Sequence, residues 1–147
     1  MPRSKTRSAK QATSAAPRKD ARFFVDRSIG RHIVPAALRD AGFPTTAHDE
    51  VFDNPTTSDE VWLETAGNKG WLVVSRDKRI RRKANELDAL KRHRVRAVFI
   101  SGKNLTGKEM GELLVRCGRK IQDTLMSSKA PAAFSLTRDG KLTKIVL

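Results

Sequence analysis

Three aspartates that follow short apolar stretches of the chain could act together. Asp26 follows the residues FFV, Asp77 follows WLVVSR, and Asp49 follows a stretch that begins near Pro44. If these stretches are parallel strands joined by right-handed crossovers, their carboxyl ends lie at one edge of the sheet, where α/β folds bind ligands. Clustered carboxylates repel one another unless cations neutralise them, and oxygen ligands favour Mg²⁺ or Mn²⁺. The spacing therefore predicts an acidic metal site at this edge.

Two further acids are expected near the same edge. A crossover helix over residues 57–66, stopped by Gly67, would begin there, and Asp59 and Glu60 lie in its first turn. Both acids also have a structural explanation, because Thr57 and Glu60 form a capping box and the helix dipole favours a negative charge at Asp59. Either acid could complete the metal site.

The chain is strongly basic, with 30 Lys and Arg residues against 16 Asp and Glu and a net charge of +14. Such an excess favours polyanionic partners, of which nucleic acid is the commonest. Aromatic residues make up only 5% of the chain, which favours contacts to phosphates over base stacking. An acidic metal site in a basic protein suggests a phosphodiester substrate. The residues expected to bind its phosphates, which would equally suit a solvated face, are Arg27, Lys78, Arg79, Arg81 and Arg82.

Apolar runs and helical periodicity alternate along the chain. Strands are expected at residues 23–25, 44–48, 72–74 and 95–100, and helices at 31–41, 57–66 and 85–92. A capping box over residues 106–109 starts another helix, and an Asp-Gly pair within 134–147 predicts a β-hairpin. The fold class is therefore α/β, a small parallel sheet with helices on both faces and a C-terminal hairpin. The apolar stripe of the last helix consists of Met110, Leu113, Leu114, Cys117, Ile121 and Leu125.

Residues 1–22 form a basic stretch with no large apolar residue beyond the initiator methionine. Such a segment cannot offset its ordering entropy by burial, so we expect a disordered tail and then one domain over residues 23–147, with the hairpin at 133–147. The sequence shows no signal peptide and no run of about 18 apolar residues, and its single cysteine falls in a helical core pattern. These features predict a cytoplasmic protein without a membrane partner.

The order and spacing of several motifs resemble a known family. The stretches FFVDRSIG, ALRDAGF, HDEVF, TSDEVW and GWLVVSRDKRI together resemble the PIN-like domain of VapC-type toxin ribonucleases over residues 23–100. The resemblance implies a Mg²⁺-dependent endoribonuclease that acts on RNA, pairs with an antitoxin protein and is compatible with a homodimer. It implies catalytic acids at Asp26, at Asp59 or Glu60, and at Asp77, with Ile80 in the apolar position of the last motif.

One position departs from the family pattern. Many PIN domains carry a further acid shortly after the last strand aspartate, whereas Lys78 and Arg79 follow Asp77 here. Either Asp49 completes the metal site or only three acids bind metal, which leaves one or two metals open. His48, beside Asp49, could contact substrate or serve as a hydrogen-bonded residue at a strand end.

Two other classes of function compete with a nuclease. The first is a PIN-like module without catalysis that binds RNA or a protein through its basic surface. The second is a receiver-like signalling domain, in which Asp26, Asp49 and Lys103 would imitate a phosphoacceptor site. The net charge of +14 and the basic residues after Asp77 fit the receiver-like class poorly.

Overall fold

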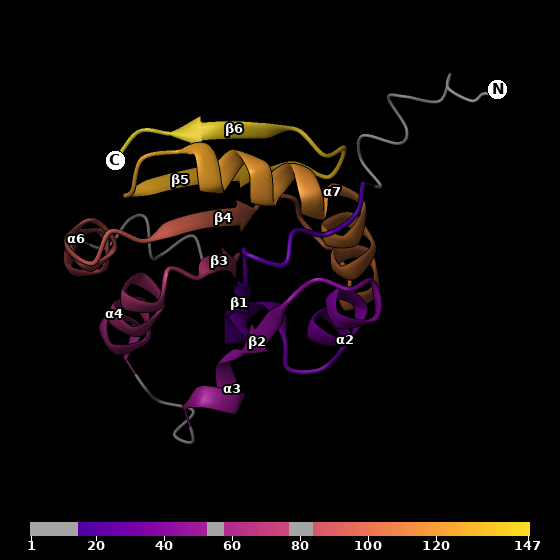
Figure 1. Ribbon diagram of the computed structural model, residues 1–147, viewed down its shortest axis with the longest axis horizontal. Coiled ribbons are helices and arrows are strands. Elements are labelled where there is room, and N and C mark those ends of the chain that lie inside the picture. Colours follow the sequence, from indigo (N-terminus) through magenta and orange to yellow (C-terminus); the bar gives the residue numbers. More distant parts are fainter. Residues whose placement is uncertain (1–14, 53–57, 77–83) are drawn as a thin grey trace, which may run out of the picture.

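The computed structural model describes residues 15–52, 58–76 and 84–147, and within them a single sheet runs through the molecule (Figure 1). The strand order is β2-β1-β3-β4-β5-β6; the first five strands are parallel and β6 is antiparallel to β5. The strands are β1 (Phe23–Val25), β2 (Thr45–Ala47), β3 (Leu72–Ser75), β4 (Arg96–Ile100), β5 (Ala132–Leu136) and β6 (Leu142–Ile145). The helices are η1 (Arg27–Ile29), α2 (Ile33–Asp40), α3 (His48–Val51), α4 (Asp59–Lys69), α6 (Ala84–Arg92) and α7 (Gly107–Ser127).

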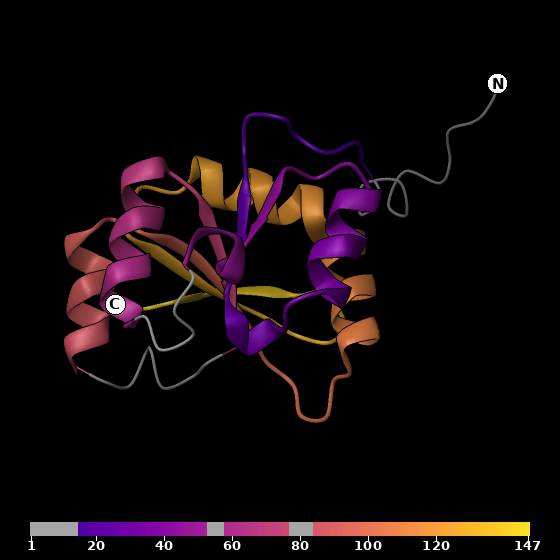
Figure 2. The ribbon, with the colours of Figure 1, turned by 90° about the horizontal axis from the view of Figure 1, so that it is seen from below.

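Helices cover both faces of the sheet, as the sequence predicts. Figure 2 shows α2 and α7 on one side and α4 and α6 on the other. Alternate strand residues enter two separate cores: Phe23 and Val25 pack with α2 and α7, whereas Phe24 packs with α4 and α6. Because both faces are covered, β1 and β3 are buried along their whole length, which explains their continuous apolar sequences.

The crossover helices do not all have the same hand. Helix α2 leads from β1 toward the β2 edge of the sheet, whereas α4 and α6 lead toward the β6 edge and lie on the opposite face. Because both the direction and the face are reversed, these three crossovers have the same hand. Helix α7 continues in the direction of α6 but lies on the α2 face. The crossover from β4 to β5 therefore has the opposite hand, and the expectation of one common hand is wrong there. The carboxyl ends of β1 to β5 still share one edge because these strands are parallel.

Helix α4 differs from its prediction at both ends. It begins after Ser58 and ends at Gly70, whose φ of 70° gives the left-handed conformation that glycine favours. The predicted stop, Gly67, lies inside the helix, where a Cβ atom would come within 2.0 Å of the His93 carbonyl oxygen. Gly67 is therefore a site of close approach between α4 and the end of α6. The buried residues on this helix are Trp62, Leu63 and Ala66, whereas Val61 is exposed.

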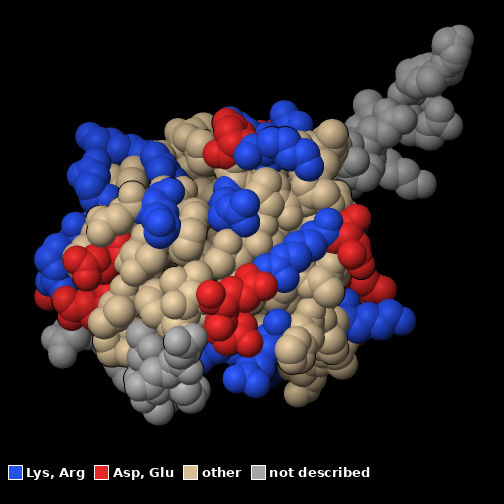
Figure 3. Space-filling view, turned by 60° about the horizontal axis from the view of Figure 1, so that its bottom comes forward, with Lys and Arg blue, Asp and Glu red and all other residues tan. Residues whose placement is uncertain are grey.

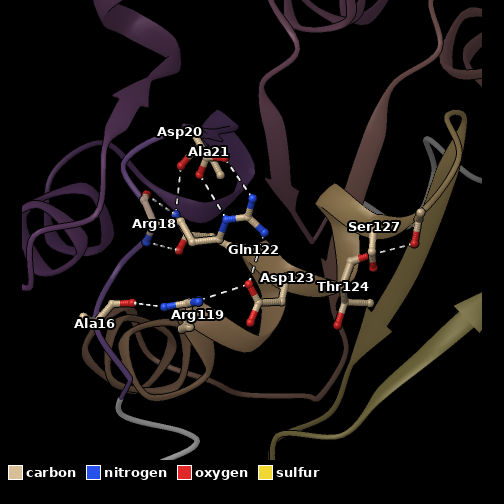
Figure 4. A network of polar contacts seen from close by, with 10 residues as sticks. Ala16, Arg18, Asp20, Ala21, Arg119, Gln122, Asp123, Thr124 and Ser127 are labelled. Carbon is tan, nitrogen blue, oxygen red and sulfur yellow. Dashed lines mark hydrogen bonds and ion pairs between the residues drawn. The ribbon is translucent and has the colours of Figure 1, made fainter.

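The N-terminal prediction can be compared with the structure only from Ala15 on, and there the chain packs against α7 (Figure 4). The fully buried Gln122 side chain accepts a hydrogen bond from the Arg18 amide and donates to the carbonyl oxygens of Arg18 and Ala21. Ala21 is itself buried. The predicted tail boundary at residue 22 is therefore wrong, because residues 18–21 find hydrogen-bond partners on α7.

The last third of the chain follows its prediction closely. Thr106 and Glu109 exchange the two hydrogen bonds of a capping box at the start of α7, and the apolar stripe of that helix, including Cys117, is buried. Strands β5 and β6 form the antiparallel hairpin, closed by a hydrogen bond from the Thr137 amide to the Lys141 carbonyl oxygen. Among the described residues, no helix is both long and hydrophobic enough to cross a bilayer.

Candidate active site at the carboxyl end of the sheet

The strand order places Asp26 where an α/β sheet usually binds its ligand. From β1 the chain goes to β2 on one side of the sheet, and β3 then pairs with β1 on the other side. The carboxyl ends of β1 and β3 therefore flank the point at which the strand order reverses, the general ligand position in such sheets. Asp26 directly follows β1, and its amide donates a 3.0 Å hydrogen bond to the Val74 carbonyl oxygen in β3.

Two serine hydroxyls hold the Asp26 carboxylate. Asp26 is 3% exposed and is the single buried acid among the described residues. Its Oδ2 atom accepts hydrogen bonds from Ser28 Oγ at 2.8 Å and from Ser75 Oγ at 3.0 Å. The two hydroxyl oxygens are 3.2 Å apart, and the Arg76 amide donates to Ser28 Oγ. This network fixes the orientation of one carboxylate at the end of the sheet.

The local sequence explains how Ser28 reaches Asp26. After β1 the chain makes the short 3₁₀ helix η1, in which the Ile29 amide donates to the Asp26 carbonyl oxygen. The Ile29 side chain is buried and anchors this turn, while Gly30 leaves it with a φ of 109°, which favours glycine. The DRSIG sequence therefore brings the Ser28 hydroxyl back onto the carboxylate two residues earlier.

Arg76 fixes the end of β3 next to this network. Its guanidinium donates to the carbonyl oxygens of Leu105 at 3.3 Å and Gly102 at 3.0 Å, both in the loop between β4 and α7. Arg76, Ser28 and Ser75 were not predicted from the sequence as parts of the site. The available signal was polar residues directly after two apolar strands, but it could not show that residues 28 and 75 meet.

The other predicted acids lie in different surroundings or outside the described residues. Glu60 is exposed and forms a 2.6 Å ion pair with Arg92 at the end of α6. Asp49 lies in α3 instead of directly after a strand, with Oδ2 3.7 Å from Arg31 Nε. Asp59 is the first residue of α4, but its side chain is not among those that the structure describes. Asp77 and the predicted phosphate-binding residues Lys78, Arg79, Arg81 and Arg82 fall within the undescribed segment 77–83, and Arg27 is exposed in η1.

Exposed acids on this part of the molecule are balanced by arginines. Glu50 in α3 accepts a hydrogen bond from the Ala47 amide and contacts Arg39, and these two interactions hold the pKa of the Glu50 carboxyl below its usual range. Figure 3 likewise shows red acidic groups next to blue Lys and Arg side chains across the visible face. Asp49, Glu50 and Glu60 therefore each have an arginine partner that compensates their charge without a metal.

The described residues supply only part of a metal site. No group of three or more His, Cys, Asp or Glu residues that could hold a metal ion occurs within 15–52, 58–76 and 84–147. Asp26 has the chemistry of a ligand for a hard cation, since it is a carboxylate whose orientation is fixed by neighbouring hydroxyls. The remaining ligands would have to come from residues such as Asp59 and Asp77.

Comparison with known proteins agrees with this geometry. The sequence profile of the family described as PIN like domain matches residues 21–102, more than half of the 147 residues and the whole region from β1 to β4. A protein of Mycobacterium tuberculosis named "Putative ribonuclease VapC45" is 41% identical over 66 residues, which cover 43% of this chain and 48% of that protein. The chain thus spans about half the length of this curated relative. No solved structure matches the chain.

The matched region contains the motifs on which the resemblance to PIN-like toxin ribonucleases rests, including DRSIG with Asp26 and the strand that precedes Asp77. The observed fold, a mostly parallel sheet with helices on both faces and a terminal hairpin, is the one that this resemblance implies. The family assignment made from the motifs is therefore confirmed: the chain belongs to the PIN-like domain family.

Proposed function

We propose that this protein is a Mg²⁺- or Mn²⁺-dependent endoribonuclease and the toxin of a toxin–antitoxin pair. The observation that carries the proposal is the buried Asp26 carboxylate, held by two hydroxyls at the point where the strand order reverses. Its support is the PIN-like family and the name of the M. tuberculosis relative. RNA is the proposed substrate, and an antitoxin protein is the proposed partner.

Asp26 would hold the metal together with Asp77 and Asp59. We favour Asp59 over Glu60 because the Glu60 carboxylate is already paired with Arg92. A bound Mg²⁺ supplies Lewis-acid stabilisation of negative charge on the attacked phosphate and makes a nearby water more acidic. The Ser28 and Ser75 hydroxyls keep the Asp26 carboxylate oriented, because both donate to the same oxygen atom.

The basic residues near this edge would bind the substrate. Arg27 lies next to Asp26 in the chain, and Lys78, Arg79, Arg81 and Arg82 follow Asp77. Their charges would attract the phosphates that flank the cleaved bond without reading the base sequence. Water as the nucleophile would leave a 3′-hydroxyl and a 5′-phosphate.

A non-catalytic PIN-like module that binds RNA or protein is the second candidate. Two observations favour it: basic residues occupy the positions after Asp77, and the Glu60 carboxylate is paired with Arg92. Both reduce the number of carboxylates that are available for metal.

Cleavage of a labelled single-stranded RNA in the presence and absence of Mg²⁺ tests the proposal. Asp26→Asn and Asp77→Asn should each abolish cleavage, while circular dichroism shows an unchanged or higher melting temperature because a repelling charge has been removed. Asp88→Asn, which alters an exposed acid on α6, is the matched control and should cleave normally. Full Mg²⁺-dependent cleavage by Asp26→Asn would refute the assignment. RNA binding without cleavage by the unaltered protein would support the non-catalytic module.

A further inference from the structure

A basic hollow lies at the edge of the sheet where the strands begin, opposite to Asp26. Its volume is about 530 Å³. Arg96, one of its lining residues, pairs with Leu72, which lies three residues before Ser75 in β3. The hollow is therefore about 10 Å along the strands from the carboxyl edge of the sheet. The hollow is lined by Gly67 and Asn68 of α4, Arg92, His93 and Arg94 at the end of α6, Arg96 of β4, and Lys129 and Ala130 before β5.

The cations of this hollow outnumber the acids that pair with them among the described residues. Arg92 pairs with Glu60 and lies in the last turn of α6, where the helix dipole favours a positive charge. Arg94, Arg96 and Lys129 lie beyond the helix ends, and none of them forms an ion pair with another described residue. Three positive charges therefore converge on one concavity without an internal counterion in the described part of the chain.

Arg94 has a backbone conformation that arginine adopts at a cost. Its φ is 56°, in the left-handed region. The Arg94 amide donates to the Lys91 carbonyl oxygen, and the Val95 amide donates to that of Leu90, which are the two hydrogen bonds of a Schellman motif at the end of α6. Glycine is the usual residue at this position because it has no Cβ. The backbone at residue 94 thus suits glycine better than arginine, and the exposed Arg94 side chain is available for another role.

The walls of the hollow are held in place by tertiary contacts. Gly67 allows α4 to approach the His93 carbonyl oxygen so closely that a Cβ atom would clash with it. Arg96 is half-buried, and its Nε atom donates a 2.9 Å hydrogen bond to the Ser128 carbonyl oxygen. These contacts join the end of α6 to α4 and the end of α7 to β4, so the backbone around the hollow is in place before any ligand binds.

We propose that this hollow binds the phosphodiester backbone of RNA, as an anchoring site separate from the edge that carries Asp26. Arginine is suited to phosphate because its guanidinium can donate two parallel hydrogen bonds. The lining contains no large aliphatic residue and no Phe, Trp or Tyr, so apart from its arginines it lacks the side chains that usually anchor protein interfaces. The lining therefore favours a polyanionic backbone over an acidic protein. The inference deepens the proposed ribonuclease function and rests on RNA being its substrate.

The test measures RNA binding without cleavage. The full chain carrying Asp26→Asn is titrated, in the presence of a chelator, with two unrelated fluorescent single-stranded RNAs at several salt concentrations. In this background, Arg94→Gly combined with Lys129→Gln removes two charges from the hollow. Lys108→Gln combined with Arg116→Gln removes two exposed charges from α7 and is the matched control.

Loss of two phosphate contacts should reduce the slope of log affinity against log salt by about 1.4, at about 0.7 per contact for single strands. The reduction should be the same for both RNAs and absent from the control. Arg94→Gly alone should weaken RNA binding while the melting temperature stays unchanged or rises, because glycine suits the left-handed backbone. Weaker binding with a lower melting temperature would overturn this assignment of Arg94.

An unchanged slope in the double variant, or an equal reduction in the control, would overturn the proposed anchoring site. These outcomes are distinguishable from failure of the nuclease proposal. If the unaltered protein binds RNA with the expected slopes but never cleaves it, the anchoring site stands and the nuclease function fails. If it cleaves RNA but the double variant keeps its slope, the nuclease stands and the anchoring site fails.

Discussion

Asp26 and Glu60 carry the same chemical group in opposite surroundings. Asp26 is 3% exposed and receives two hydroxyl hydrogen bonds, whereas the Glu60 side chain is 55% exposed and pairs with Arg92. An exposed ion pair contributes little to stability and is common on protein surfaces. A buried carboxylate is costly unless other groups compensate its lost hydration. The environment of Asp26 is therefore the one that indicates a function.

Burial and hydrogen bonding distinguish Asp26 from Glu60, although the sequence predicted the same metal-binding role for both. Both acids were expected at the carboxyl edge of the sheet; Asp26 directly precedes η1, and Glu60 lies in the first turn of α4. Burial and hydrogen-bond partners, which depend on the fold, distinguish a candidate ligand from a surface acid. The contrast leads to three predictions of decreasing size.

The largest effect is expected from Ser75→Ala. Ser75 is fully buried, and its hydroxyl is one of the two donors that orient Asp26. Loss of such a supporting hydrogen bond should reduce Mg²⁺-dependent RNA cleavage about 10- to 100-fold and raise the Mg²⁺ concentration needed for half-maximal activity. Ser101→Ala is the control, because Ser101 follows β4 and its amide and hydroxyl both donate to the Leu136 carbonyl oxygen, away from Asp26. Equal losses in both variants would show that Ser75 acts through stability alone.

An intermediate effect is expected from truncating the N-terminus, because residues 18–21 hydrogen-bond to the buried Gln122 side chain. Deleting residues 1–14 should leave the melting temperature unchanged, since that sequence has little to bury. Deleting residues 1–22 should lower it, because the buried Gln122 side chain loses its three hydrogen bonds, at about 1–3 kcal/mol for each unsatisfied group. Thermal unfolding of the two truncated proteins checks this. Identical melting temperatures would mean that residues 15–22 contribute nothing.

The smallest effect is expected from Glu60→Gln. The Glu60–Arg92 pair is exposed on both sides, so its loss should change the free energy of unfolding by only about 0–1 kcal/mol. RNA cleavage should stay close to that of the unaltered protein. RNA binding should not weaken, because Arg92 then lacks its counterion beside the basic hollow. A loss of cleavage comparable with that of Asp26→Asn would instead assign the metal-binding role to Glu60.

Local sequence patterns predicted the strands, the capped helix α7 and the position of Asp26, because these depend on neighbouring residues. The pairing of Ser28 with Ser75 was not predictable, since it depends on the register between β1 and β3. Gly67 was misassigned as a helix stop for a similar reason: the sequence contains both Gly67 and Gly70, and only the position of His93 distinguishes them.

Long-range contacts also account for the other errors. The segment before β1 has a composition typical of disorder, yet Gln122, more than a hundred positions away, supplies hydrogen-bond partners for it. The alternation of strands and helices predicted a helix between β4 and β5 but could not assign its face. The apolar stripe of α7 is buried against α2, and that contact places it there.

Metal binding itself is the most direct test of the claim that Asp26 anchors a metal. Isothermal titration of the full chain with Mg²⁺ and with Mn²⁺ should give saturable binding for the unaltered protein and for Glu60→Gln. Asp26→Asn should show no saturable binding at the same concentrations, with its circular dichroism spectrum unchanged. Binding by Asp26→Asn with the affinity of the unaltered protein would contradict the account.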